Sequence, residues 1–225
     1  MEAISMAIVK TYTKSWAKAY KRESKALRSA LSGIPKVKLY HIGSTAVKRA
    51  ASRPVIDIML TVADISLVTE EIMQGIGYTP ASATAFSVGT AYEKAGEEVS
   101  YRVLVYSLAD GKDITAHLDV KEYLIQNKKP RRAYSLKKMN HSGEDNYDEA
   151  MAEYKSELVS RVVKSATVMR SRTLYIPSLT FGGLLLGALI GIFAKGAFIG
   201  ATIGVLSGFV VGAVLSAIMA KKGAK

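Results

Sequence analysis

Residues 39–47 of the chain read LYHIGSTAV, and residues 53–60 read RPVIDIML. The alternation of apolar and polar side chains predicts that the first stretch begins as a half-buried strand. Gly43 then permits a tight turn, because it lacks the Cβ atom that restricts the backbone of other residues. Ser44 and Thr45 are suited to cap a short helix after the turn. The free amides and the dipole of such a helix start would attract a phosphate group.

The second stretch predicts a buried strand over residues 55–60, in which Asp57 is the only charged residue. A carboxylate in such a strand is costly unless it is paired, hydrogen-bonded or bound to a metal. One interpretation is a metal ligand beside the phosphate-binding turn, and the other is a structural ion paired with Arg53 or with a backbone donor. The Gly-Ser pair that precedes Asp57 in the sequence favours the interpretation as a metal ligand.

A Gly-Ser pair followed by an acidic strand is typical of nucleotidyltransferases, and the two motifs resemble more closely the signature of the GrpB family. The domain of that family also occurs fused to dephospho-CoA kinase. The resemblance implies a nucleotidyltransferase-like α+β fold, a mixed β-sheet with flanking helices, whereas the activity of the family is poorly defined. It covers roughly residues 8–165 and includes further positions: Tyr12, Trp16, Ala116–Val120, Tyr123, Leu124, Tyr134, Leu136, Lys137, Tyr154 and Lys155.

Periodicity and turn signals predict the remaining elements of this domain. A hairpin turn over residues 109–112 is expected to return the chain into the sheet. The expected helices cover residues 13–32, 64–74 and 121–140, the third broken near Pro130, and a last helix begins at Ser142. The expected strands cover residues 37–42, 55–60, 99–108 and 114–120, with short strands within residues 82–94.

Charge is distributed unevenly along the 225 residues, whose net charge is +12. Residues 174–225 hold four of the 31 basic residues and none of the 19 acidic ones, so residues 1–173 have a net charge of +8. A basic domain suits nucleotides, nucleic acids or anionic lipid headgroups, although a solvated basic surface is the simpler interpretation. The absence of cysteine excludes disulfides and thiol catalysis, and no secretory signal is evident at the start.

Residues 174–220 are almost wholly apolar, and Lys195 is the only charged residue among them. About 20 apolar residues span a bilayer, so residues 174–194 and 196–220 predict two transmembrane helices with a turn at Lys195 and Gly196. The alternative is a buried hairpin of a water-soluble protein. Glycines recur every fourth residue within each expected helix, which predicts close packing of helices and homo-oligomers in the membrane. The first run is Gly183, Gly187 and Gly191, and the second is Gly196, Gly200, Gly204, Gly208 and Gly212.

The predicted organisation is a domain over residues 1–165, a linker or helix extension over 166–173, the hairpin over 174–220 and a basic tail over 221–225. Basic residues flank both ends of the hairpin, which predicts that both ends face the cytoplasm. The expected location is therefore the inner cell membrane, with the first domain in the cytoplasm. No ionisable residue lies inside either expected span, which disfavours a transport function.

Nucleotidyl transfer uses metal ions held by shared carboxylates, so the acidic residues are the candidate catalytic groups. Asp57 supplies the first, but the alternate position of the same strand is Met59, and a thioether is a poor ligand for Mg²⁺. Asp119 is the candidate second metal ligand, although the resembling family more often has histidine there. His117 lies two residues earlier and is either a general base or a histidine on the sheet face. The expected enzyme is an Mg²⁺-dependent nucleotidyltransferase with an incomplete set of carboxylates.

Phosphate groups of the ligand are expected to meet the turn and nearby cations. His41 either contacts phosphate or orients the turn through a hydrogen bond. The candidate ligand-binding residues are His41, Gly43, Ser44, Thr45, Lys48, Arg53 and Arg102.

Two functions remain open from the sequence. The first is a membrane-anchored, GrpB-like protein that binds a nucleotide or phosphorylated metabolite with Mg²⁺ and transfers a nucleotidyl group if it is catalytic. The second is a non-catalytic sensor or scaffold whose glycine-rich hairpin oligomerises in the membrane. Binding of nucleic acid through the basic run of residues 128–138 is less expected, because such runs are usually solvated helix faces.

Overall fold

The computed structural model describes residues 8–82, 90–193 and 197–222. The chain forms two compact units, residues Met1–Val159 and residues Ser160–Lys225, and each is described separately. The expected turn at residues 195–196 and the middle of the expected strand region at 82–94 lie outside the described residues.

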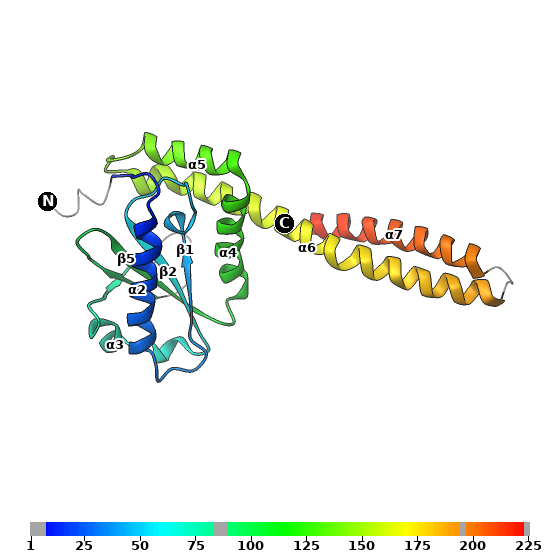
Figure 1. Ribbon diagram of the computed structural model, residues 1–225, viewed down its shortest axis with the longest axis horizontal. Coiled ribbons are helices and arrows are strands. Elements are labelled where there is room, and N and C mark those ends of the chain that lie inside the picture. Colours follow the sequence, from blue (N-terminus) through cyan, green and yellow to red (C-terminus); the bar gives the residue numbers. More distant parts are fainter. Residues whose placement is uncertain (1–7, 83–89, 194–196, 223–225) are drawn as a thin grey trace. The chain divides into compact units, whose positions relative to one another are not determined.

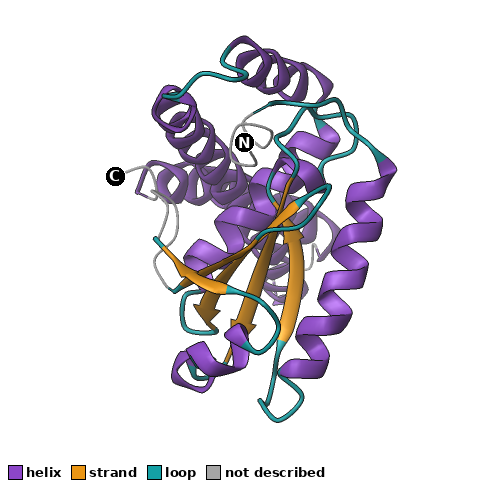
Figure 2. Cartoon of the chain, turned by 90° about the vertical axis from the view of Figure 1, so that its left-hand side faces the viewer, coloured by secondary structure: helices purple, strands orange, loops and turns teal. Residues whose placement is uncertain are grey.

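The first unit is built on a five-stranded sheet, which confirms the predicted mixed α+β class (Figures 1 and 2). The sheet order is β1-β2-β5-β4-β3, in which β2 and β5 are parallel and all other neighbours antiparallel. The strands are β1 (Lys38–Ile42), β2 (Val55–Val62), β3 (Thr79–Ala81), β4 (Ala91–Lys94) and β5 (Ser100–Ser107).

One face of the sheet packs against the amphipathic helix α2 (Lys14–Ala30). Trp16 and Leu27 of α2 are buried against Ile56, Ile58 and Leu60 of β2. These side chains share one face because alternate residues of a strand point the same way. The hydrophobic core therefore leaves Asp57 and Met59 on the opposite face.

That opposite face is covered by α4 (Gly111–Gln126), so helices lie on both sides of the sheet. The prediction of a returning strand over residues 114–120 is wrong. β5 already pairs with β2 on one edge and with β4 on the other, so no edge of β5 is left for another strand. Ile114 and Leu118, four residues apart on one helix face, instead pack against Met59, Leu104 and Tyr106.

The other elements of the first unit largely follow the predicted pattern. The expected helix at 64–74 is divided into η2 (Ile65–Leu67), capped by Asp64, and α3 (Glu70–Gln74), capped by Thr69. The helical region after α4 breaks at Asn127, before α5 (Lys128–Asn140). Pro130 lies in the first turn of α5, where a missing N–H costs nothing. The last helix, α6 (Tyr147–Phe193), runs through the predicted linker at 166–173.

The second unit contains the C-terminal part of α6 and the helix α7 (Ala197–Lys222). Gly183 of α6 lies against the backbone of Gly204 and Gly208, and Gly208 lies against Leu179. A Cβ at Gly183 or Gly208 would overlap a backbone carbonyl oxygen of the facing helix. Among the residues that the structure describes, no helix is both long and apolar enough to cross a bilayer, so the predicted transmembrane spans are not supported.

Candidate functional site

The Gly43–Ser44 turn lies between β1 and a single 3₁₀ turn, η1 (Ser44–Ala46). Gly43 has φ 69°, a conformation that favours glycine. The expected helix after the turn is only these three residues long, because the chain leaves the 3₁₀ conformation at Val47. Three residues give almost no helix dipole, so the attraction of a phosphate must come from other groups.

Asp57 of β2 faces this turn, as the sequence predicts. Its carboxylate lies against Gly43, where an added Cβ would overlap Asp57 Oδ2. Among the described residues no ion pair involves Asp57, and Arg53 pairs with Asp148 instead. Burial raises the pKa of the Asp57 carboxyl, while Arg102, Lys138 and other nearby cations lower it in part.

A cavity of about 660 Å³ opens beside the turn. This volume is in the range of pockets that hold small molecules. Its wall combines polar groups at the turn with an apolar side that includes Leu104, Leu124 and Leu158. The charged residues that line it are Arg53, Asp57, Arg102, Asp113, Lys121, Lys138, Asp148 and Lys155.

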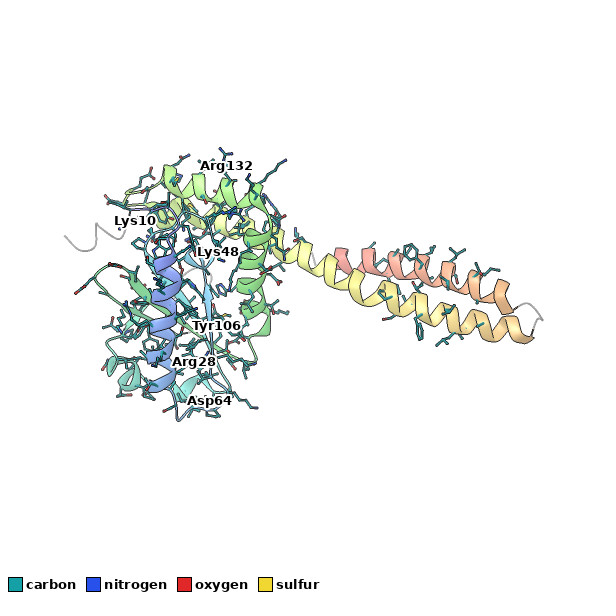
Figure 3. The ribbon with its side chains drawn as sticks, viewed as in Figure 1. Lys10, Arg28, Lys48, Asp64, Tyr106 and Arg132 are labelled. Carbon is teal, nitrogen blue, oxygen red and sulfur yellow. The ribbon has the colours of Figure 1, made fainter. Side chains whose placement is uncertain are left out.

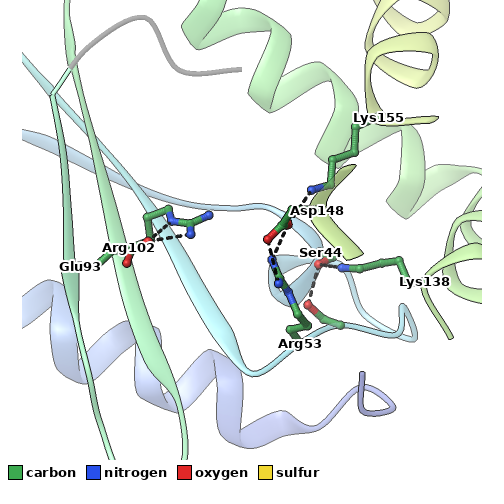
Figure 4. A network of polar contacts seen from close by, with 8 residues as sticks. Ser44, Arg53, Glu93, Arg102, Lys138, Asp148 and Lys155 are labelled. Carbon is green, nitrogen blue, oxygen red and sulfur yellow. Dashed lines mark hydrogen bonds and ion pairs between the residues drawn. The ribbon is translucent and has the colours of Figure 1, made fainter. Parts of the chain in front are cut away.

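Lys138 of α5 is the most deeply buried cation of the cavity, with 4% of its surface exposed. Its Nζ donates a hydrogen bond of 2.6 Å to Ser44 Oγ, and Ser44 Oγ shares another of 2.6 Å with Ser52 Oγ (Figure 4). Nζ also lies 5.2 Å from the ring centroid of Tyr134. Burial, and next the charge of Lys155, lower the pKa of Lys138 to about 7. A lysine buried at a cavity wall with a strongly lowered pKa indicates a candidate binding site.

A second group of charges surrounds Asp148 of α6. Arg53 donates two hydrogen bonds to the Asp148 carboxylate, at 2.8 and 3.1 Å, and its guanidinium lies 4.3 Å from the ring centroid of Tyr147. Lys155 Nζ lies 3.9 Å from Asp148 Oδ1. Partial burial would raise the pKa of Asp148, but the hydrogen bonds from Arg53 lower it. Burial lowers the pKa of Lys155. Asp148 thus holds Arg53 and Lys155 at the cavity.

Arg102 of β5 brings a further guanidinium to the same side of the sheet. It is the register partner of Asp57 on β2 and of Glu93 on β4. Its Nε and Nη2 contact Glu93 Oε1 at 2.7 and 2.6 Å (Figure 4). The Glu93 carboxylate therefore positions the guanidinium, which also lines the cavity.

The structure gathers some of the sequence-predicted site residues at the cavity and leaves others outside. Those that line it are Gly43, Ser44, Arg53, Asp57, Arg102 and His117. His41 and Thr45 do not line it: His41 Nε2 and Thr45 Oγ1 share a hydrogen bond of 3.1 Å, and Thr45 Oγ1 donates to the Val55 carbonyl at 3.2 Å. His41 thus orients the turn, and burial lowers its pKa to about 4. Lys48 is exposed outside the cavity (Figure 3).

The predicted pairing of Asp57 with Asp119 is not formed at the cavity. Both His117 and Asp119 lie on α4 instead of a strand, and only His117 lines the cavity. His117 Nε2 shares a hydrogen bond of 2.9 Å with Tyr106 Oη. Burial, and then Asp113, raise the pKa of Tyr106 to about 12. The loss of the expected strand therefore removes the geometric basis for a second carboxylate next to Asp57.

The residues around Asp57 do not fit the two-metal site of nucleotidyltransferases. Such a site needs several oxygen ligands around each ion. Met59, at the alternate position of β2, is fully buried among apolar side chains. Asp148 is bound by Arg53. Within the described part of the chain, no group of three or more acidic or histidine side chains is placed to hold a metal ion.

Sequence reasoning did not assign any residue of α5 or α6 to the site, although Tyr134 and Lys155 are among the positions of the family resemblance. The residues concerned are Tyr134, Lys138, Tyr147, Asp148 and Lys155. Lys138 belongs to a basic run that reads as a solvated face. The usable signal was the spacing of four residues between Tyr134 and Lys138, which places both on the buried face of one helix.

The fold and the site together define an α+β domain with a basic cavity at a Gly-Ser turn between β1 and β2. Residues 6–165 match the GrpB protein family, and the chain belongs to that family.

Two curated relatives are similar over part of their length. UPF0157 protein YqkA of Bacillus subtilis (strain 168) is 27% identical over 129 residues, which cover 56% of this chain and 37% of YqkA. UPF0157 protein BH1888 of Halalkalibacterium halodurans is 37% identical over 70 residues, 30% of this chain and 35% of that protein. The matches thus span little more than a third of either relative.

Among solved structures, the chain is similar to the crystal structure of conserved protein GrpB from Enterococcus faecalis. The TM-score is 0.63 and the identity 25%, over 71% of this chain and 99% of the other. The similarity agrees with the family assignment and with the fold of the first unit.

Proposed function

We propose that the domain binds a nucleotide or another phosphorylated small molecule in the cavity beside Gly43 and Ser44. The observation that carries this proposal is Lys138, an ammonium buried to 4% exposure that donates to Ser44 Oγ at the cavity wall. A buried cation is costly unless an anion compensates it. A phosphate at the turn would accept hydrogen bonds from Lys138 and approach Arg53, Arg102 and Lys155.

The apolar side of the cavity supports a ligand with an organic part. Leu104, Leu124 and Leu158 would contact a base or another flat group, while the phosphates meet the cations. Pockets commonly combine an apolar wall with a few polar groups that fix orientation. A nucleoside phosphate has both halves of this chemistry.

We favour binding without turnover, which agrees with the non-catalytic part of the second function and makes no use of its membrane hairpin. Met59 occupies the position where a second carboxylate would be needed, and it belongs to the apolar core. Nucleotidyl transfer by the usual two-metal route requires that carboxylate. A sensor or carrier of a phosphorylated metabolite needs only the cavity and its cations.

Thermal unfolding of the purified chain tests the proposal. Nucleoside triphosphates and inorganic triphosphate should raise the melting temperature, measured both with Mg²⁺ and with EDTA, whereas adenosine should not. The variant Arg102→Gln should lose most of the shift, and Arg28→Gln, an exposed change on α2, should keep it. No shift with any phosphorylated compound under either condition would reject the proposal. Transfer of label from a nucleoside triphosphate to a product would reject the absence of turnover.

A further inference from the structure

Three carboxylates line the cavity, those of Asp57, Asp113 and Asp148, but no group of three acidic or histidine side chains among the described residues is placed to hold a metal ion. Asp57 is the acidic side chain that faces the Gly43–Ser44 turn. Asp148, another acid that lines the cavity, is paired with Arg53 at 2.8 Å. A divalent cation that bridges ligand phosphates to a protein usually needs at least one or two free carboxylates.

Four cations from separate parts of the fold surround the Asp57 carboxylate. Arg53 precedes β2, Arg102 lies on β5, Lys138 on α5 and Lys155 on α6. All four lower the pKa of the Asp57 carboxyl, so each lies within electrostatic range of it. The charge of Lys155 also lowers the pKa of Lys138, which adds to the effect of burial. Like charges held together in this way favour a bound polyanion.

Three of these cations are held in place by neighbouring side chains and keep further N–H donors for phosphate. The carboxylates of Asp148 and Glu93 hold Arg53 and Arg102 from one side. Lys138 Nζ uses one described hydrogen bond, to Ser44, and an ammonium has three donors. Guanidinium and ammonium groups fixed in advance can do for phosphate what a metal ion does elsewhere, because they supply positive charge without reorganisation.

We propose that this cavity binds the phosphate groups of its ligand directly, through Arg53, Arg102, Lys138 and Lys155, and needs no divalent cation. This rests on the proposed function and specifies its ligand as the metal-free polyphosphate. Asp57 then balances part of the positive charge in the ligand-free protein and is not a metal ligand. Mg²⁺ in solution competes with the protein for the phosphates.

Isothermal titration calorimetry with ATP and with inorganic triphosphate, in EDTA and in excess Mg²⁺, tests the inference. The dissociation constant in EDTA should be equal to or lower than that in Mg²⁺. Binding that occurs only with Mg²⁺ would overturn the inference and leave the proposed function in place. Binding in neither condition would overturn both.

Two variants make the test specific to the cavity. Replacing both lysines, Lys138→Met with Lys155→Met, should weaken binding in EDTA at least tenfold, whereas the exposed change Lys129→Met on α5 should not. Asp57→Asn should bind triphosphate more tightly, because it removes a negative charge that repels the ligand. A metal site predicts the reverse for Asp57→Asn, so weaker binding by a folded Asp57→Asn protein would contradict the inference.

Discussion

Replacing Lys138 with methionine should stabilise the ligand-free protein at neutral pH. Lys138 is charged in the unfolded chain, and burial lowers its pKa in the folded protein from 10.5 to about 7. At 1.36 kcal/mol for each pH unit, that difference corresponds to about 5 kcal/mol of lost stability at pH 7 and below. Methionine has a similar length and no charge to bury.

The variant also loses contacts that offset part of this gain. The hydrogen bond to Ser44 is worth about 1–2 kcal/mol, and the contact with the Tyr134 ring about 0.5–1 kcal/mol. Ser44 keeps its hydrogen bond with Ser52, so its hydroxyl is not left without a partner. The net expectation is that Lys138→Met increases the free energy of unfolding by about 2–3 kcal/mol at pH 7.

The sign of the pH dependence follows from the lowered pKa. Between pH 7 and 10.5 the unfolded chain binds more protons at Lys138 than the folded protein does, so wild-type stability rises with pH. The difference in free energy of unfolding between the variant and the wild type should therefore shrink by about 1.36 kcal/mol per pH unit and disappear at about pH 9.

Urea unfolding, followed by the fluorescence of the single tryptophan, measures this effect. Trp16 is buried in the core between α2 and the sheet, so its emission reports on the first unit. The buffer must be free of phosphate. Lys129→Met, an exposed change on the same helix, should stay within about 0.5 kcal/mol of the wild type. A Lys138→Met protein that is less stable at pH 7, or whose advantage does not change with pH, would refute the reasoning.

Four further predictions follow from individual contacts. Gly43→Ala should lose more than about 1 kcal/mol of stability and all triphosphate binding, because its φ is positive and its Cβ would displace Asp57. Urea unfolding and titration calorimetry measure the two effects, and Gly33→Ala is the control. Triphosphate affinity should fall as pH rises above about 7, where Lys138 loses its charge, and titration calorimetry of Lys138→Met should show a flatter profile. Glu23→Ala should cost about 2–4 kcal/mol in urea unfolding, because buried Glu23 accepts hydrogen bonds from Tyr78 and from Lys94; a loss below about 1 kcal/mol would contradict this. Gly183→Val should speed proteolysis of the second unit, since its side chain would meet Gly204, whereas the neighbouring Gly182→Val has open space and should not.

Local pattern was enough to predict much of the sheet and its turn. β1, β2, β5 and α2 have clear periodicity, and Gly43 together with Asp57 on the next strand defines where the turn meets the acidic strand. Residues 114–120 show why local pattern is not sufficient. Their alternation fits a strand, but β5 already pairs with both β2 and β4, so a returning strand has no edge of β5 to join.

Arg53 and Arg102 were predicted as cations of the site, but the contributions of α5 and α6 could not be predicted from local sequence, for a related reason. Lys138 lies 94 residues from Ser44, and Asp148 lies 95 residues from Arg53. These contacts depend on how α5 and α6 pack beside the Gly43–Ser44 turn and Arg53, and the periodicity of the sequence does not determine that packing. A lysine in a basic run also gives no sign of burial unless its spacing from Tyr134 is considered.

A crystal structure of the protein with bound ATP tests the central claim most directly. We predict phosphate oxygens within hydrogen-bonding distance of Lys138 Nζ, beside the Gly43–Ser44 turn, with the base against the apolar wall that includes Leu124 and Leu158. Well-ordered ATP bound at another surface, with only water in this cavity, would contradict the claim.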